Sequence, residues 1–258
     1  MASSRPALSR RSFLVGSAAA AASVALGAGT AQARGSSSRP VALVYRGPAS
    51  SYWCQESVAN LLRSGPVDFT VKYVGPGEST QFDARALRDA SLYAQPGGGS
   101  VASAWPHLMA QAPAMRDFVR GGGVYLGFCL GAYLAAPGLG FGVFDGSATR
   151  YANTPGSDVN TLGGALVGVD WRGADRTMYF QDGPKFAPAS MRGVTVLGRY
   201  RTGAIAALVS RYGNGSVGLV GPHAEADRTW YPAGMTDPDG LDADLGHDLI
   251  ATAWRARR

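Results

Sequence analysis

Apolar runs alternate with amphipathic segments through the first half of the chain, which predicts strands and helices in turn. The run at residues 41–45 ends at a Gly-Pro pair and predicts a buried strand, and apolar side chains at helical spacing predict a helix over residues 54–64. Further strands are predicted at residues 69–74, 92–96 and 124–128. Two helical pieces are predicted within residues 104–120, and another helix at residues 130–136. Strands that alternate with helices in this way favour a parallel sheet with helices on both faces.

The second half of the chain is richer in predicted strands. Short apolar or alternating runs occur at residues 165–171, 177–180, 194–200, 204–211 and 216–220. Gly213, Asn214 and Gly215 between the last two runs are typical of a hairpin turn, and a helix is predicted at residues 244–254. We therefore expect an α/β fold with a doubly wound, mostly parallel sheet and a β-rich hairpin extension in the C-terminal half.

The beginning of the chain has the layout of a signal peptide. Arg5, Arg10 and Arg11 precede an uncharged Ala-rich stretch that ends in an Ala-x-Ala sequence suited to cleavage. The pair Arg10-Arg11 resembles the twin-arginine export motif, which predicts an extracellular or cell-envelope location. A membrane-anchoring helix is the alternative, although the stretch falls short of the ~20 strongly apolar residues that span a bilayer. We expect no stable membrane span after cleavage, with a signal peptide at residues 1–33, a linker at 34–40 and one domain at 41–258.

Charge and cysteine content exclude several classes of protein. The net charge of +6 falls to about +3 without the three signal-peptide arginines, and no Lys/Arg run indicates nucleic-acid binding. The two cysteines, Cys54 and Cys129, are too few for a disulfide scaffold, and no Cys/His cluster has the spacing of a structural zinc site. We expect neither a metal nor a cofactor.

The sequence Gly-Phe-Cys-Leu-Gly at residues 127–131 predicts a nucleophile elbow centred on Cys129. Small residues two positions before and after the cysteine allow the sharp strand-to-helix turn that exposes its side chain. The N-terminus of the following helix favours a thiolate there. A buried structural cysteine in a Gly-rich turn is the alternative.

Two more segments supply partners for such a nucleophile. A predicted strand ends shortly before His223 and Glu225, so the imidazole can take the thiol proton while the carboxylate orients the ring. Backbone N–H groups of Gly98 and Leu130 could stabilise an oxyanion. The simpler interpretations are a hydrogen-bonded surface histidine and a flexible turn at residues 97–99.

The order of these motifs resembles class I glutamine amidotransferases. The motifs are Pro-Gly-Gly-Gly at residues 96–99, the elbow at 127–131 and Gly-Pro-His-Ala-Glu at 221–225. Residues 44–48, 127–133 and 178–186 are similar to the N-terminal domain of biotin-protein ligase, and the resemblance covers roughly residues 40–255. It implies a flavodoxin-like sheet and a triad of Cys129, His223 and Glu225.

The chain departs from that family at several positions. Tyr133 stands where glutaminases carry the Gln that helps to hold the substrate, so we do not expect glutamine hydrolysis and assign Tyr133 to the pocket. Leu130 stands where the related protease-like branch has His. No Arg/Gly-rich adenylate loop of a biotin ligase occurs, and we do not expect biotin transfer. Cys54, at the start of the first predicted helix, could line the pocket, pair with Cys129 or simply pack.

The sequence therefore predicts an exported, thiol-dependent hydrolase that acts on an amide-type bond of a small molecule or peptide. A non-catalytic binding module on the same fold is the first alternative. A redox protein that uses Cys54 and Cys129 is the second.

Overall fold

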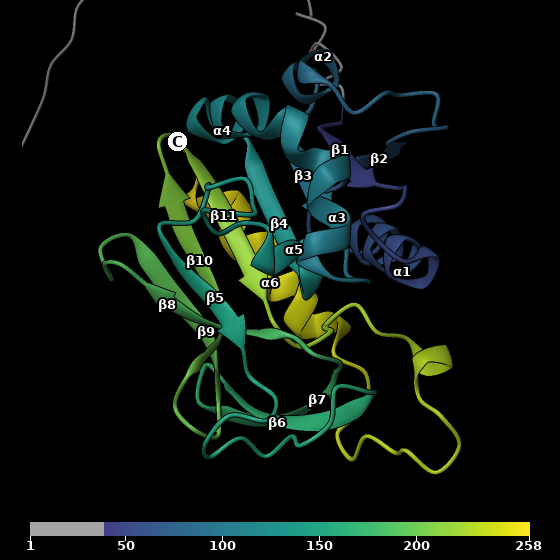
Figure 1. Ribbon diagram of the computed structural model, residues 1–258, viewed down its shortest axis with the longest axis vertical. Coiled ribbons are helices and arrows are strands. Elements are labelled where there is room, and N and C mark those ends of the chain that lie inside the picture. Colours follow the sequence, from purple (N-terminus) through teal and green to yellow (C-terminus); the bar gives the residue numbers. More distant parts are fainter. Residues whose placement is uncertain (1–38) are drawn as a thin grey trace, which may run out of the picture. The chain divides into compact units, whose positions relative to one another are not determined.

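The computed structural model describes residues 39–258, which form an eleven-stranded mixed sheet with helices packed against it (Figure 1). The strand order is β2-β1-β3-β4-β11-β10-β9-β6-β7, and β5 and β8 form a further pair that joins the sheet through β10. The predicted signal peptide and most of the predicted linker lie outside the described residues, so both remain predictions.

Five strands at one side of the sheet run parallel. They are β1 (Val41–Tyr45), β2 (Thr70–Val74), β3 (Leu92–Gln95), β4 (Val124–Phe128) and β11 (Gly215–Val220). The other six join them in antiparallel pairs: β5 (Gly146–Arg150), β6 (Ala165–Trp171), β7 (Ala174–Phe180), β8 (Pro184–Pro188), β9 (Val194–Tyr200) and β10 (Ile205–Tyr212).

The expectation of a mostly parallel, flavodoxin-like doubly wound sheet with a hairpin extension is therefore wrong. Within residues 39–258, six of the ten strand pairs are antiparallel. Parallel neighbours need a crossover of about a dozen residues or more, whereas two-residue turns force antiparallel pairing. Two-residue turns join β6 to β7 at Arg172-Gly173 and β10 to β11 at Gly213-Asn214. The second half of the chain thus continues the same sheet and returns β11 to its centre beside β4.

Helices cover both faces of the parallel strands. They are α1 (Tyr52–Arg63), α2 (Ala84–Arg88), α3 (Val101–Leu108), α4 (Ala112–Arg120), α5 (Leu130–Tyr133) and α6 (Ala243–Ala256), with short 3₁₀ turns η1 (Met109–Gln111) and η2 (Arg228–Trp230). Alternate residues of β1 enter two separate cores: Ala42 and Val44 pack with residues of α1 and α6, and Leu43 and Tyr45 with residues of α2, α3 and α4. No helix within residues 39–258 is long and apolar enough to cross a bilayer.

Candidate active site

Cys129 lies on a sharp turn between β4 and α5, as the elbow motif predicts. Its backbone has φ 48° and ψ −105°, a left-handed conformation that costs a residue other than Gly about 1–3 kcal/mol. The turn is fixed from the neighbouring strand, because the Cys129 N–H donates to the Val220 carbonyl at 3.0 Å. A Cβ on Gly127 would lie 2.5 Å from the Gly131 oxygen, and one on Gly131 would overlap the carbonyl of Gln95. Both glycines are therefore required by the elbow.

His223 and Glu225 follow β11 and form a buried pair. The Nδ1 atom of His223 lies 2.8 Å from Oε1 of Glu225, and the two side chains are 3 % and 0 % exposed. The His223 N–H donates to the Tyr179 carbonyl at 2.8 Å, which fixes the backbone beneath the ring. Within residues 39–258, Oε2 of Glu225 is buried without a hydrogen-bond partner.

The environment of His223 favours its charged form. Burial lowers its pKa, but the charges of Glu225 and of Cys129, together with hydrogen bonds to both, raise the pKa well above its ordinary value of 6.5. The thiol of Cys129 lies with His223 at one cavity. It also lies 3.3 Å from the Gln181 carbonyl, to which it can donate.

Gly97 marks the point where the site side chains converge. A Cβ built on it would lie 3.2 Å from Cε1 of His223, 3.3 Å from Sγ of Cys54 and 3.4 Å from Cβ of Cys129. The absence of a side chain at Gly97 therefore leaves the space that these three residues share. The sequence motif singled out Gly98 as a hydrogen-bond donor and gave no sign of this role for Gly97.

The two predicted oxyanion donors border the same cavity. Gly98 and Leu130 both line it, and within residues 39–258 neither backbone N–H donates a hydrogen bond outside the helices and strands. Gly98 has φ 107°, and a Cβ there would overlap the backbone of Ser51, so only Gly suits this position. The oxyanion role of the two N–H groups stays a prediction.

Cys54 lies in the first turn of α1 and borders the same cavity as Cys129. The hydroxyl of Ser51 donates to its sulfur at 3.0 Å. Burial raises the pKa of Cys54 to about 11, with a lowering influence from the charge of His223. Cys54 is therefore a neutral thiol at neutral pH, and both cysteines are free. Its neighbour Glu56 binds Arg46 and Tyr73 and does not line this cavity.

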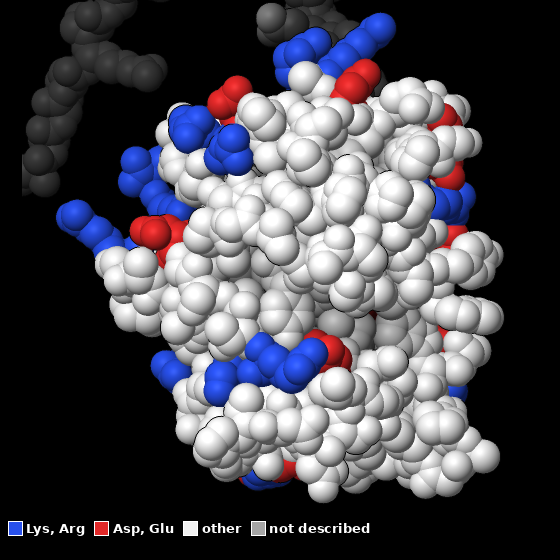
Figure 2. Space-filling model, viewed as in Figure 1, with Lys and Arg blue, Asp and Glu red and all other residues white. Residues whose placement is uncertain are grey.

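The cavity in front of Cys129 has a volume of about 710 Å³. Tyr133 lines it as predicted, and its hydroxyl donates to the Asp182 carbonyl at 3.2 Å. Burial, then the charge of Asp182, raises the pKa of Tyr133, so the phenol stays neutral. Arg150 and Asp182 form an ion pair on the same wall, with Nε 2.7 Å from Oδ1. Figure 2 shows one largely uncharged face of the molecule, with a hollow flanked by a small group of basic and acidic side chains.

Several lining residues were not predicted as site residues. Arg150, Asp182 and Trp230 come from β5, from the turn before β8 and from η2, which lie far apart in the sequence. Asp182 belongs to residues 178–186, a segment that resembles the N-terminal domain of biotin-protein ligase. The sequence nevertheless offered no reason to place Asp182 in the cavity. Among residues 39–258, no group of three or more His, Cys, Asp or Glu side chains is arranged to hold a metal ion.

Comparison with protein families supports the resemblance seen in the motifs. Residues 41–153 match the family described as "Biotin-protein ligase, N terminal". This match confirms the resemblance to that family. No curated protein matches the chain in sequence.

Solved structures are similar to this chain in fold alone, because their sequence identities are low. A glutamine amidotransferase from Thermotoga maritima is 16 % identical, with 84 % of this chain and 96 % of that chain covered and a TM-score of 0.51. A ThuA-like protein from Bacteroides uniformis is 14 % identical, with 84 % and 91 % covered and a TM-score of 0.50. The chain spans 29 % of the length of a GH42 beta-galactosidase mutant from G. stearothermophilus, with 12 % identity over 83 % of this chain and a TM-score of 0.47.

Proposed function

We propose that this protein is an exported cysteine amidohydrolase, with Cys129 as nucleophile, His223 as proton carrier and Glu225 as the residue that orients and charges the imidazole. The observation that carries the proposal is the convergence of Cys129 and His223 on one open cavity, with Glu225 buried 2.8 Å behind the ring. A buried carboxylate in that position fixes the tautomer and stabilises the imidazolium.

The first half of the reaction forms a thioester. The Cys129 thiolate attacks the amide carbon, and the N–H groups of Gly98 and Leu130 receive the negative charge that develops on the oxygen. The His223 imidazolium then donates its proton to the amide nitrogen. The C–N bond breaks, and the amine leaves.

The second half of the reaction restores the enzyme. The neutral imidazole of His223 takes a proton from water, whose oxygen attacks the thioester carbon. The C–S bond breaks, the carboxylic acid leaves, and the imidazolium–thiolate pair returns. No electron transfer and no co-reactant beyond water are needed.

The wall around Tyr133 argues against glutamine as the substrate. A phenol hydrogen-bonded to the chain at Asp182 occupies the position where an amidotransferase would place its amide side chain. The adjacent Arg150–Asp182 pair instead offers one donor group and one acceptor group to the acyl part of a polar substrate. Export by the twin-arginine route is part of the proposal and rests on residues 1–33.

A binding module without turnover is the second candidate. The observation that favours it is the contact of the Cys129 thiol with the Gln181 carbonyl, because this contact suits a neutral thiol that donates rather than a thiolate. The two candidates differ in whether an acyl group placed on Cys129 is released.

The test is acylation by p-nitrophenyl acetate. We expect a burst of p-nitrophenolate, transfer of the acetyl group to the Cys129 peptide as seen by mass spectrometry, and its release over further turnovers. Cys129→Ala should abolish the burst, and His223→Ala should reduce both acylation and release. His247→Ala is the matched control, because His247 contacts Ser64 and lines no part of this cavity.

The outcomes separate the two candidates. An acetyl group that stays on Cys129 without release favours the binding module. Acylation elsewhere, or at Cys129 with no dependence on His223, overturns the amidohydrolase proposal.

A further inference from the structure

A second, smaller pocket opens beside the cavity and is walled by aromatic rings. Its volume is about 210 Å³, and Trp53, Tyr179 and Trp230 are among its lining residues. It shares Cys54 and Trp230 with the main cavity, so the two spaces lie next to each other. For comparison, an apolar cavity of about 150 Å³ can hold one benzene molecule.

The inner aromatic wall is fixed by contacts on several sides. Trp230 donates its indole N–H to the Ser57 hydroxyl of α1 at 3.2 Å. Its ring centre lies 5.0 Å from that of His223 and 5.5 Å from that of Tyr179, which it meets edge-on. Tyr179 in turn packs against Tyr231, with ring centres 5.3 Å apart. The wall therefore keeps its shape without a ligand.

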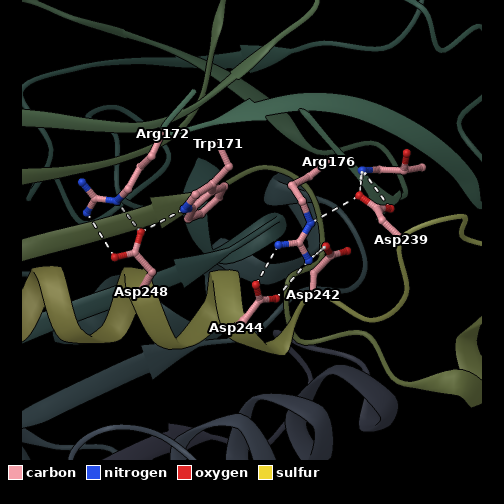
Figure 3. A network of polar contacts seen from close by, with 8 residues as sticks. Trp171, Arg172, Arg176, Asp239, Asp242, Asp244 and Asp248 are labelled. Carbon is pink, nitrogen blue, oxygen red and sulfur yellow. Dashed lines mark hydrogen bonds and ion pairs between the residues drawn. The ribbon is translucent and has the colours of Figure 1, made fainter. Parts of the chain in front are cut away.

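An ion-pair network ties down the segment that carries Trp230 (Figure 3). Arg176 on β7 lies 3.3 Å from Asp239, 3.0 Å from Asp242 and 2.7 Å from Asp244, where the loop after η2 enters α6. The far end of the loop is thus anchored by contacts of one arginine with three acidic side chains.

The outer wall is an aromatic ring that solvent reaches. Trp53, in the first turn of α1, is 66 % exposed, a large apolar surface at the mouth of a pocket whose other walls are preformed. Exposed aromatic rings beside a concave site are typical of ligand-binding surfaces. The neighbouring Tyr52 is 63 % exposed, yet it lines neither pocket.

The position of the pocket assigns it to one part of the substrate. In the proposed reaction, the leaving nitrogen must reach the imidazole of His223 to receive its proton. Trp230 packs on that imidazole, so the aromatic pocket lies on the leaving-group side. Arg150 and Asp182 line only the main cavity and therefore face the acyl part.

We propose that the amine part of the substrate carries an aromatic ring, which the pocket of Trp53, Tyr179 and Trp230 binds next to His223. The substrate class is thus an amide of an aromatic or arylmethyl amine with a polar acyl part. This inference rests on the proposed function, because the proposed reaction decides which pocket holds the amine part and which holds the acyl part. The pocket and its preference for aromatic rings can be tested without turnover.

The test compares three chloroacetamides as alkylating agents of Cys129. Sγ bonds to the CH₂ carbon and chloride leaves, so labelling reports recruitment to the site and needs no hydrolysis. The amide nitrogen carries a methyl, a cyclohexylmethyl or a benzyl group, and each rate is divided by the rate with glutathione. We expect the benzyl compound to label the Cys129 peptide roughly tenfold faster than the methyl compound, and faster than the cyclohexylmethyl compound.

Variants at two exposed hydrophobic residues provide the contrast. Trp53→Ala should bring the benzyl-to-methyl ratio close to one, and Met191→Ala should leave the ratio unchanged, because Met191 is 53 % exposed and lines neither pocket. Tyr52 is no suitable control, because its ring packs edge-on against Trp53 with ring centres 5.8 Å apart. Both replaced side chains are largely exposed, so neither change removes core packing.

A reactive Cys129 without a benzyl preference, or with equal benzyl and cyclohexylmethyl rates, overturns the aromatic pocket and leaves the amidohydrolase proposal standing. The same holds for a preference that survives Trp53→Ala. A Cys129 that none of the three compounds labels overturns both proposals.

Discussion

The Glu225→Gln substitution tests the charge that the site places behind His223. Gln keeps the size of the side chain and one acceptor oxygen, but it removes the negative charge 2.8 Å from Nδ1. Because both side chains are buried, water screens the pair little. The imidazolium therefore loses its main support, and the pKa of His223 should fall.

The size of the effect follows from the distance. An opposite charge within ~4–6 Å changes a proton equilibrium by about one to three powers of ten. We expect the lower end, because Gln still accepts a hydrogen bond. At about pH 7.5, where an unperturbed imidazole is mostly neutral, the imidazolium that faces the cavity should then be rarer in the variant, and labelling of Cys129 should be roughly tenfold slower than in the wild type.

The assay is the rate of iodoacetamide labelling of the Cys129 peptide across the pH range. The variant should be labelled more slowly near neutral pH, and the difference should shrink as the pH rises and the wild type also loses its imidazolium. Glu56→Gln is the control, because it removes a carboxylate that binds Arg46 and Tyr73 outside the cavity. Similar thermal midpoints for the wild type and the two variants would exclude unfolding as the cause of slower labelling. A Glu225→Gln profile that overlays the wild type, or an equal change in Glu56→Gln, would refute the reasoning.

Gly131→Ala should reduce the free energy of unfolding by about 3 kcal/mol or more, because the added methyl group overlaps the Gln95 carbonyl, and thermal denaturation measures the loss. Burial raises the pKa of Asp242 from its ordinary 3.8 to about 8, so the folded protein keeps a proton that the unfolded chain has lost, and stability should fall as pH rises between these values. Asp242→Asn should flatten that fall in a pH series of thermal midpoints. Replacing Arg10 and Arg11 by Lys should trap the precursor inside the cell, and undiminished secretion on an immunoblot would contradict the export route.

Local sequence patterns predicted most elements of the parallel region and the hairpin of β10 and β11, but not the directions of the other later strands. Apolar runs such as residues 194–200 and 204–211 are compatible with parallel or antiparallel neighbours, and only the lengths of their connections decide. The strands β5 and β8 were missed because β5 is mostly polar and exposed, and because β8 begins and ends with Pro. Neither shows the alternation that predicts a strand.

The site residues can likewise be separated into those that a local sequence pattern predicted and those that it did not. Cys129, His223 and Glu225 were placed by short motifs whose spacing reflects a local turn. Trp230 reaches the cavity through a contact with Ser57, 173 positions away in the sequence, which no local pattern can show. Gly97 was missed for a different reason, since its role is to leave space for three side chains from other elements.

The mixed sheet explains why these motifs meet. The hairpin between β10 and β11 reverses the chain, so that β11 runs parallel to β4 with Val220 opposite Phe128. Both strands therefore end at the same edge, one directly before Cys129 and the other three residues before His223. A slip of one residue in this register would displace the end of β11 by about 3.3 Å. Such a slip would also break the bond from Cys129 N–H to Val220 that fixes the elbow. The hairpin of β10 and β11, which the turn at residues 213–215 predicts, thus holds the His223 segment in register with Cys129.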